Sequence, residues 1–219
     1  MLTLYGFDVS NYYNMIKLAL AIKGIEYETV TLYPSQTPEY LQLSHMGKVP
    51  ALKTEHGMLT ETNIILEYLD QAYPEKPLYP GNAYEQAKIK ELVKVLELYL
   101  ELPGRRCHAA AFFGSSVSEE TRKEVKRALY KGMEALSRLA NFSPYVAGNE
   151  FTAADIMFLY SADLSATVAH KLFDIDLLSL IPGAKDLMVL LNEHEAVKKI
   201  AEQRKEANVA FKQYLANLK

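Results

Sequence analysis

Short apolar runs and helical periodicity alternate over the first third of the chain. Leu2–Tyr5 is an apolar run that stops at Gly6, which predicts a buried strand. From Tyr12, apolar residues recur at helical spacing as far as Gly24, a favoured residue for a helix C-terminus. Residues 27–32 are rich in β-branched side chains and predict a second strand.

The pattern continues with a short helix and a hairpin. Pro38 favours a helix through Leu43, a strand follows Pro50, and Gly57 allows a turn into a return strand. Residues 62–72 then carry an apolar helical face. The predicted order is β-α-β-α-β-β-α, with the first two strands parallel and the last two antiparallel.

The rest of the chain is predicted to be helical. Residues 74–83 read PEKPLYPGNA, a composition typical of a linker. Apolar positions at helical spacing follow over 89–100, over 125–136 and from 151, with two further helices expected after Pro182. We therefore expect an α/β domain at 1–75, a linker at 76–83 and an all-helical domain at 84–219.

The composition of the chain excludes some kinds of binding partner and favours one cellular compartment. The net charge is −3, which argues against a nucleic-acid partner. Cys107 is the only cysteine, so the chain has neither an intrachain disulfide nor a cysteine-based metal site, and we expect no metal. The first ten residues have neither a basic start nor a long apolar run, so we expect no signal peptide, and no apolar run approaches the roughly 20 residues that span a bilayer. We expect a cytoplasmic protein without membrane contact.

Four local motifs, taken together and in their order along the chain, are more informative than any one of them alone. They are Gly47-Lys48-Val49-Pro50-Ala51-Leu52, Glu61-Thr62 before Ile64–Leu69, Leu78-Tyr79-Pro80, and Thr152-Ala153-Ala154-Asp155. Together they resemble the cytosolic glutathione S-transferase superfamily, of bacterial type with a serine loop, over essentially the whole chain. The resemblance implies a thioredoxin-like α/β N-terminal domain that binds glutathione. It also implies an all-α C-terminal domain that contains the pocket for an electrophile.

The resemblance assigns the peptide part of glutathione to the segment before the third strand. Pro50 would follow a cis peptide bond, so that the backbone of Val49 pairs with the cysteinyl part of the ligand. Lys48 would meet the glycyl carboxylate, and His45 and Gln36 lie in nearby loops. A trans proline that starts a strand is the commoner reading of an isolated X–Pro bond.

The γ-glutamyl end of glutathione carries an ammonium and a carboxylate. Glu61 can meet the ammonium, while the Thr62 hydroxyl and free helix N–H groups can meet the carboxylate. Thr62 can equally serve as a plain helix cap. We expect both roles, because capping and binding are compatible.

Ser10 occupies the position at which serine-type transferases activate the thiol. A hydroxyl that donates to sulfur at a helix N-terminus favours the thiolate, which is the nucleophile. Serine is also a preferred N-cap, so Ser10 could be a cap alone. Asn11 and Tyr12 are expected to contact glutathione, and together with Tyr5 they rival Ser10 as donors to the sulfur.

Neither position 10 nor position 13 is a cysteine, which disfavours thiol–disulfide chemistry on a protein thiol. The leading function is a detoxifying transferase whose glutathione thiolate attacks a small hydrophobic electrophile or reduces an organic peroxide. The alternative is a non-enzymatic binding or regulatory protein of the same fold. An isomerase of the zeta type is disfavoured, because its S-S-C-like loop is absent. The family also implies a homodimer.

Two features of the helical half remain. Thr152 and Asp155 fit a capping motif and receive no ligand. Arg105–His108 and Phe112-Phe113 lie in a region that faces the electrophile pocket in the family. Their alternative interpretation is a charged surface turn with aromatic residues in the core. Cys107 is expected to be a buried small hydrophobe.

Overall fold

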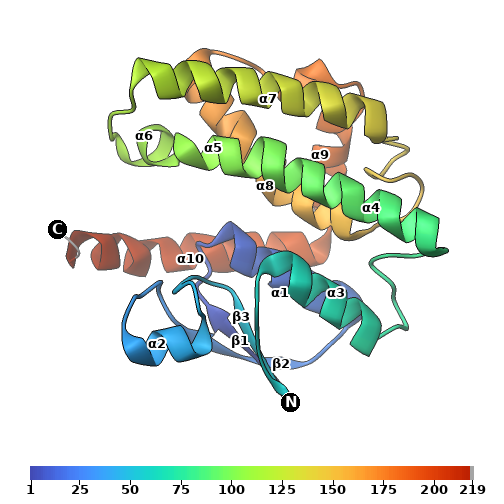
Figure 1. The fold of residues 1–219 in the computed structure, drawn as a ribbon, viewed down its shortest axis with the longest axis vertical. Coiled ribbons are helices and arrows are strands. Elements are labelled where there is room, and N and C mark those ends of the chain that lie inside the picture. Colours follow the sequence, from blue (N-terminus) through green and yellow to red (C-terminus); the bar gives the residue numbers. More distant parts are fainter. Residues whose placement is uncertain (218–219) are drawn as a thin grey trace. The chain divides into compact units, whose positions relative to one another are not determined.

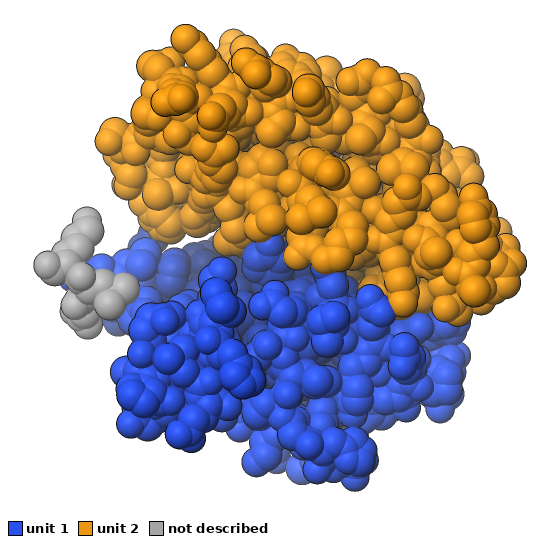
Figure 2. Space-filling model, viewed as in Figure 1, with its two compact units in different colours: residues 1–78, 192–219 blue, residues 79–191 orange. Residues whose placement is uncertain are grey.

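The computed structural model of the protein describes residues 1–217, and these form two compact units. Figure 2 shows the first unit, residues 1–78 with the described residues from 192 to 217, in blue, and the second unit, residues 79–191, in orange. The boundary after residue 78 falls inside the predicted linker 76–83. The last helix differs from the expectation, because it groups with the first unit and not with the helical residues that precede it.

The first unit contains a four-stranded mixed sheet in the order β2-β1-β3-β4, three strands of which, β1, β2 and β3, are labelled in Figure 1. Its strands are β1 (Leu2–Gly6), β2 (Tyr27–Thr31), β3 (Ala51–Thr54) and β4 (Gly57–Thr60). β1 runs parallel to β2, whereas β3 is antiparallel to β1 and to β4. This is the thioredoxin-like arrangement that the sequence predicted.

Over residues 1–217, four helices complete the first unit. They are α1 (Asn11–Lys23), α2 (Pro38–Leu43), α3 (Thr62–Ala72) and α10 (Glu195–Asn217). α1 ends at Gly24 in the left-handed conformation, as predicted. Leu4, Leu18, Leu52 and Leu66 bring β1, α1, β3 and α3 into one core and are fully buried. Each contributes about 1.5–3 kcal/mol through its removal from water.

The second unit is helical. Its elements are α4 (Ala83–Leu96), a π-helical segment (Glu97–Glu101), α5 (Leu102–Arg106), α6 (His108–Phe113), α7 (Glu119–Leu139), α8 (Ala153–Phe173), a 3₁₀ turn (Leu178–Leu180) and α9 (Ala184–Glu193), which reaches the unit boundary. The two helices expected after Pro182 are therefore α9 and α10.

The helix predicted over 89–100 does not continue as a regular α-helix. The chain turns π-helical at Glu97–Glu101, and Pro103, two residues after this segment, has no N–H to donate to the carbonyl of Tyr99. α7 comes very close here, because a Cβ on Gly132 would lie 2.4 Å from the Tyr99 oxygen. Ser165 of α8 donates to the Leu100 carbonyl at 2.8 Å. Neighbouring helices thus stabilise the irregular turn.

The predicted capping motif of α8 is confirmed. The Thr152 hydroxyl accepts from the Ala154 amide at 3.2 Å, and Asp155 Oδ2 accepts from the Thr152 amide at 2.7 Å. Asp155 Oδ1 also accepts from the Val146 amide at 2.8 Å. The buried carboxyl therefore ties the preceding loop to the helix start, which is a folding role.

Candidate active site

The candidate site begins with the four residues Phe7–Ser10 between β1 and α1, which we call the site loop. β1 ends at Gly6, and a Cβ there would lie 2.2 Å from the Tyr13 ring. Glycine at this position lets Tyr13 of the first helical turn pack over the strand end. The Ser10 amide donates to the Phe7 carbonyl at 3.0 Å, which closes the loop into a tight turn.

Ser10 is the N-cap of α1. Its backbone is extended, and its Oγ accepts weakly from the Tyr13 amide at 3.4 Å. The capping role that the sequence allowed is therefore present. A serine hydroxyl keeps its own hydrogen when it accepts, so capping leaves Ser10 able to donate to a ligand. The side chain is half-buried at the positive end of a thirteen-residue helix.

The rivals of Ser10 lie close by in the chain. Asn11 is buried at the first position of α1, and Tyr12 is half-buried beside it. Tyr5 is half-buried on β1, where it pairs with Val30 and Ala51. Tyr13 is a poorer candidate, because burial and the nearby Asp8 carboxylate raise the pKa of its phenol well above the usual value.

The segment before β3 has the predicted form. The Val49–Pro50 peptide bond is cis. Within residues 1–217, neither backbone group of Val49 takes part in a hydrogen bond. A short extended backbone without partners can accept a peptide-like ligand as an added strand.

The side chains around this segment face solvent. The Lys48 side chain is exposed, and its amide donates to Ser44 Oγ at 3.1 Å, which fixes the backbone without using the ammonium. His45 and Gln36 are also exposed, and Gln36 donates to the Met46 carbonyl at 3.2 Å.

Glu61 and Thr62 follow β4 directly. We expected Thr62 to cap the helix, but the cap position belongs to Glu61, and Thr62 is the first residue of α3. The prediction was wrong by one residue, because Glu61 has φ 67° and ψ 118°, so the chain bends before it enters the helix. A non-glycine residue with positive φ is strained, and such residues gather at functional sites. The Glu61 side chain is exposed and makes no capping bond.

The register of the sheet brings these segments together at one end of the strands, which we call the sheet edge. Tyr5 pairs with Ala51, and Ala51 pairs with Thr60. The end of β1, the start of β3 and the end of β4 therefore lie side by side, each about 4.8 Å from the next. The site loop, Lys48–Pro50 and Glu61–Thr62 all leave the sheet from this edge. Open α/β sheets bind their ligands at such strand ends.

Sequence reasoning missed a polar cluster beneath the site loop. Lys17 is buried on α1, and its ammonium forms an ion pair with Asp8. Asn14 of the same helix donates to the Asp8 carbonyl at 2.8 Å. The available signal was a lysine within the otherwise apolar run from Met15 to Leu20, which is an expensive placement unless the charge is paired.

The region 105–113 gives a mixed result. Cys107 is fully buried, as expected, and burial raises the pKa of its thiol. Phe112 and Phe113 are exposed, so the alternative that placed them in the core was wrong. Both rings contact the His108 ring, with centroids 4.7 and 5.4 Å away.

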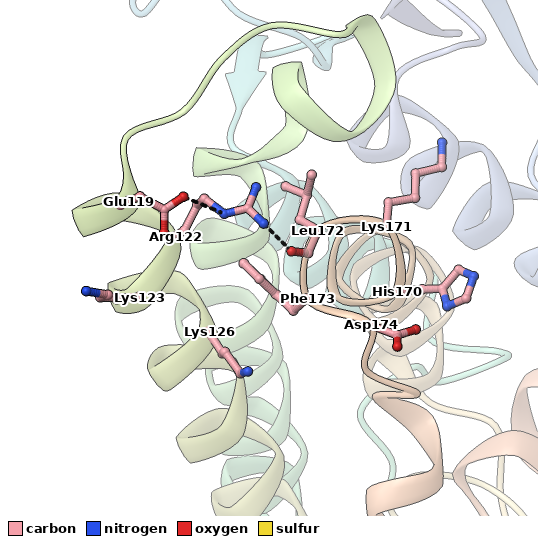
Figure 3. Close-up of a pocket in the computed structure, with 9 residues that line it drawn as sticks. All are labelled: Glu119, Arg122, Lys123, Lys126, His170, Lys171, Leu172, Phe173 and Asp174. Atoms are coloured by element: carbon pink, nitrogen blue, oxygen red, sulfur yellow. Dashed lines mark hydrogen bonds and ion pairs between the residues drawn. The ribbon is translucent and has the colours of Figure 1, made fainter.

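The second unit also contains an open cavity of about 760 Å³, lined by α7 and the end of α8 (Figure 3). Its lining residues are Glu119, Arg122, Lys123, Lys126, His170, Lys171, Leu172, Phe173 and Asp174. Arg122 lies at the centre, where it contacts Glu119 and the Leu172 carbonyl (Figure 3). A lining this rich in charge does not suit a small hydrophobic electrophile, so we do not assign the electrophile pocket here.

Residues 1–217 offer neither a cluster of metal ligands nor a helix that could span a membrane. Over 1–217, the acidic, histidine and cysteine side chains form no group of three or more that could hold a metal ion. No helix in that range has the length and apolar character needed to cross a membrane.

Comparison with known proteins places these features in a family. Residues 4–77 match the family model described as the glutathione S-transferase N-terminal domain. A glutathione S-transferase of Pseudomonas putida is 46% identical over 211 residues, which are 96% of each chain. A zeta-class glutathione S-transferase of Euphorbia esula is 27% identical and covers 92% of this chain, with 87% of its own length matched.

Solved structures agree on the fold. Glutathione transferase F2 from Populus trichocarpa superposes with a TM-score of 0.79 at 21% identity, over 94% of this chain and 100% of its own. A bacterial zeta-class maleyl pyruvate isomerase superposes with a TM-score of 0.71 at 20% identity, over 90% and 95% of the two chains. Since the Pseudomonas relative matches almost the whole chain, and the fold and N-terminal family model agree with it, the protein belongs to the glutathione S-transferase superfamily and is a glutathione transferase.

Proposed function

We propose that the protein binds glutathione at the sheet edge and that Ser10 activates its thiol. The observation that carries the proposal is the convergence, on one edge, of a helix N-terminus capped by Ser10, the partner-free Val49 backbone and the strained Glu61. Each suits a different part of one ligand. Glutathione has a thiol in the middle, a peptide backbone around it, and charged groups at both ends.

Different residues of the site bind the γ-glutamyl, cysteinyl and glycyl parts of glutathione. Glu61 pairs with the γ-glutamyl ammonium, while the Thr62 hydroxyl and the first amides of α3 receive the neighbouring carboxylate. Val49 pairs with the cysteinyl backbone, and Lys48 meets the glycyl carboxylate. Asn11 and Tyr12 border the sulfur. Ser10 donates its hydroxyl hydrogen to the thiolate, so it stabilises the nucleophile and does not attack.

The activated thiolate then attacks a small hydrophobic electrophile or reduces an organic peroxide. A thiol with a pKa near 8.5 is only a few per cent ionised at neutral pH, so a lower pKa directly raises the amount of nucleophile. The electrophile pocket belongs, in this proposal, to helical residues after the linker 76–83. The cytoplasmic location stays a prediction.

The test is a titration of the protein with glutathione by calorimetry, followed by the ultraviolet absorbance of the bound thiolate against pH. Activity is then measured with a chloronitroaromatic compound and with an aromatic hydroperoxide. S-methylglutathione is the control, because it offers the same contacts but no ionisable thiol. Binding with a lowered thiol pKa and turnover of either substrate supports the proposal. Absence of binding contradicts it, and binding without a lowered thiol pKa contradicts the role given to Ser10.

We also propose a homodimer, as the family implies. Sedimentation equilibrium at micromolar concentration is expected to give twice the chain mass of 24.7 kDa. A single species at the chain mass would overturn this.

A further inference from the structure

Lys17 supports the site loop from inside the first unit. It lies in the second turn of α1, is 5% exposed, and its ammonium forms an ion pair with Asp8 Oδ1. The same ammonium lies 5.6 Å from the centroid of the Tyr13 ring. A buried ammonium with one carboxylate partner is costly to separate from it, so the pair holds Asp8 in place.

Asp8 is fixed at a second point as well. Asn14 Nδ2 donates to its backbone carbonyl at 2.8 Å, and Asn14 is fully buried. One side chain therefore holds the Asp8 backbone while another holds its carboxylate. Ser10 follows two residues later, and the loop between them is closed by the bond from the Ser10 amide to the Phe7 carbonyl. The position of the Ser10 hydroxyl therefore depends on Asp8.

The same lysine reaches the C-terminal helix. Its ammonium donates to Gln203 Oε1 of α10 at 2.6 Å. Lys17 is thus the point at which the site loop, α1 and α10 meet through polar contacts, all inside the first unit.

We propose that Lys17 is a positioning residue that acts through Asp8 to hold the Ser10 hydroxyl where it can stabilise the glutathione thiolate. This rests on the proposed function of Ser10 and adds the element that sets its geometry. Lys17 itself touches neither glutathione nor the sulfur in this proposal.

A positional effect of the Lys17–Asp8 pair on the thiol pKa can be distinguished from an electrostatic one, because the two side chains carry charges of opposite sign. If the pair acted through its electric field, loss of Lys17 would raise the thiol pKa and loss of Asp8 would lower it. If the pair acts by holding the loop, either loss moves Ser10 away and raises the thiol pKa. The phenols of Tyr13 and Tyr27 lie within electrostatic reach of Asp8, and burial together with the Asp8 carboxylate raises the pKa of both. Both phenols stay neutral, so they do not affect the comparison between the Lys17 and Asp8 variants.

The experiment uses the full chain with Lys17→Met, Asp8→Asn, the double variant, and Lys17→Arg. Lys23→Met is the matched control. Lys23 is another buried lysine of α1, and it donates to the Lys76 carbonyl at 2.6 Å and lies 3.7 Å from Asp70. Its loss therefore removes a comparable contact at the far end of the same helix, away from the site loop.

Three readouts are combined: the pKa of bound glutathione, kcat with KM for glutathione, and hydrogen exchange of the amides of residues 7–14 without ligand. We expect Lys17→Met and Asp8→Asn each to raise the thiol pKa by about one unit and to lower kcat about tenfold below that pKa, since the thiolate fraction falls tenfold per unit. KM for glutathione should change much less. The double variant should have the same thiol pKa as the more strongly affected single variant. Lys17→Arg should keep most of the low thiol pKa of the parent protein, and Lys23→Met should leave that pKa unchanged.

Opposite pKa shifts for the two single variants, or an unchanged pKa in both, overturn the proposal. If Lys17→Met fails to fold, Asp8→Asn and Lys17→Arg still decide it. Hydrogen exchange separates this inference from the proposed function, because it needs no glutathione. Unchanged exchange at residues 7–14 shows that Lys17 does not hold the loop, whereas a parent protein that never lowers the thiol pKa shows that Ser10 has been given the wrong role.

Discussion

The rings of Phe7 and Phe211 stack with centroids 5.2 Å apart and an angle of 22° between their planes. Phe7 opens the site loop, and Phe211 lies on α10. Tyr33 and Tyr214 extend the stack, with centroids 4.0 Å apart and planes 11° apart. The site loop is therefore joined to the last helix by aromatic packing as well as by Lys17 and Gln203.

Phe211→Ala should destabilise the first unit by about 1–3 kcal/mol, because it removes a half-buried ring and its stacking partners. Urea unfolding followed by circular dichroism measures the loss. Val209→Ala is the control on the same helix, since Val209 is 66% exposed and should change stability by less than about 0.5 kcal/mol. Equal effects of the two substitutions would show that the stack carries no stability.

Glu61→Gln should weaken glutathione binding by about 1.5–3 kcal/mol, because the γ-glutamyl ammonium loses its charged partner. Calorimetry measures the change, and the melting temperature should stay nearly constant, since Glu61 is exposed and makes no capping bond. Glu55→Gln is the control, because Glu55 lies in the β3–β4 turn at the opposite end of the hairpin. Unchanged affinity in Glu61→Gln would remove Glu61 from the site.

Ser10→Ala should raise the pKa of bound glutathione by about one to two units, which corresponds to the loss of one hydrogen bond to an anion. Turnover should fall with it, while ground-state affinity changes less. The thiolate absorbance of the complex, titrated against pH, measures the shift. Tyr5→Phe and Asn11→Ala are made in parallel. If either of these shifts the titration and Ser10→Ala does not, Ser10 is a helix cap alone.

Asp155 should make stability depend on pH in the acid range. Burial is the main cause that raises its pKa from 3.8 to about 6, against the opposing effect of its hydrogen bonds. Because the pKa is higher in the folded chain than in the unfolded one, its contribution is greatest below about pH 4. That contribution, about 3 kcal/mol, is lost as the pH rises through 6.

Unfolding free energies of the parent and Asp155→Asn between pH 4 and 7 test this. The variant should be less stable throughout, since one of the two oxygens that accept from the Val146 and Thr152 amides becomes an NH2 group that cannot accept, but its pH dependence should be flatter. Asp186→Asn at an exposed position of α9 should keep the parent's pH dependence. Parallel curves for parent and Asp155→Asn would show that the carboxyl has an ordinary pKa.

The sequence predicted those features of the fold that depend on interactions between residues close together in the chain. Gly24 ends α1 and Asp155 closes the capping box, since each depends on residues within a turn of itself. The cis bond before Pro50 was predicted through the family motif and is confirmed. Motif residues also indicated all three segments of the candidate site, and sheet register explains why they share one edge.

Long-range contacts could not be predicted in the same way. An amphipathic helix reveals that one face is buried but not against which partner, so the grouping of α10 with the first unit was missed. The π-helical turn depends on α7 and α8, which lie far along the chain. The left-handed Glu61 had no signal, because its own residue type disfavours that conformation.

The chain order of the two units sets the order in which they can be completed during synthesis. Residues 79–191 form an uninterrupted block, so the helical unit has all its parts before α10 leaves the ribosome. The sheet, α1 and the site loop emerge first but wait for Gln203 and Phe211, which arrive last. The half of the molecule that emerges earliest is therefore the half finished latest, and during that interval Phe7 lacks Phe211 and Lys17 lacks Gln203.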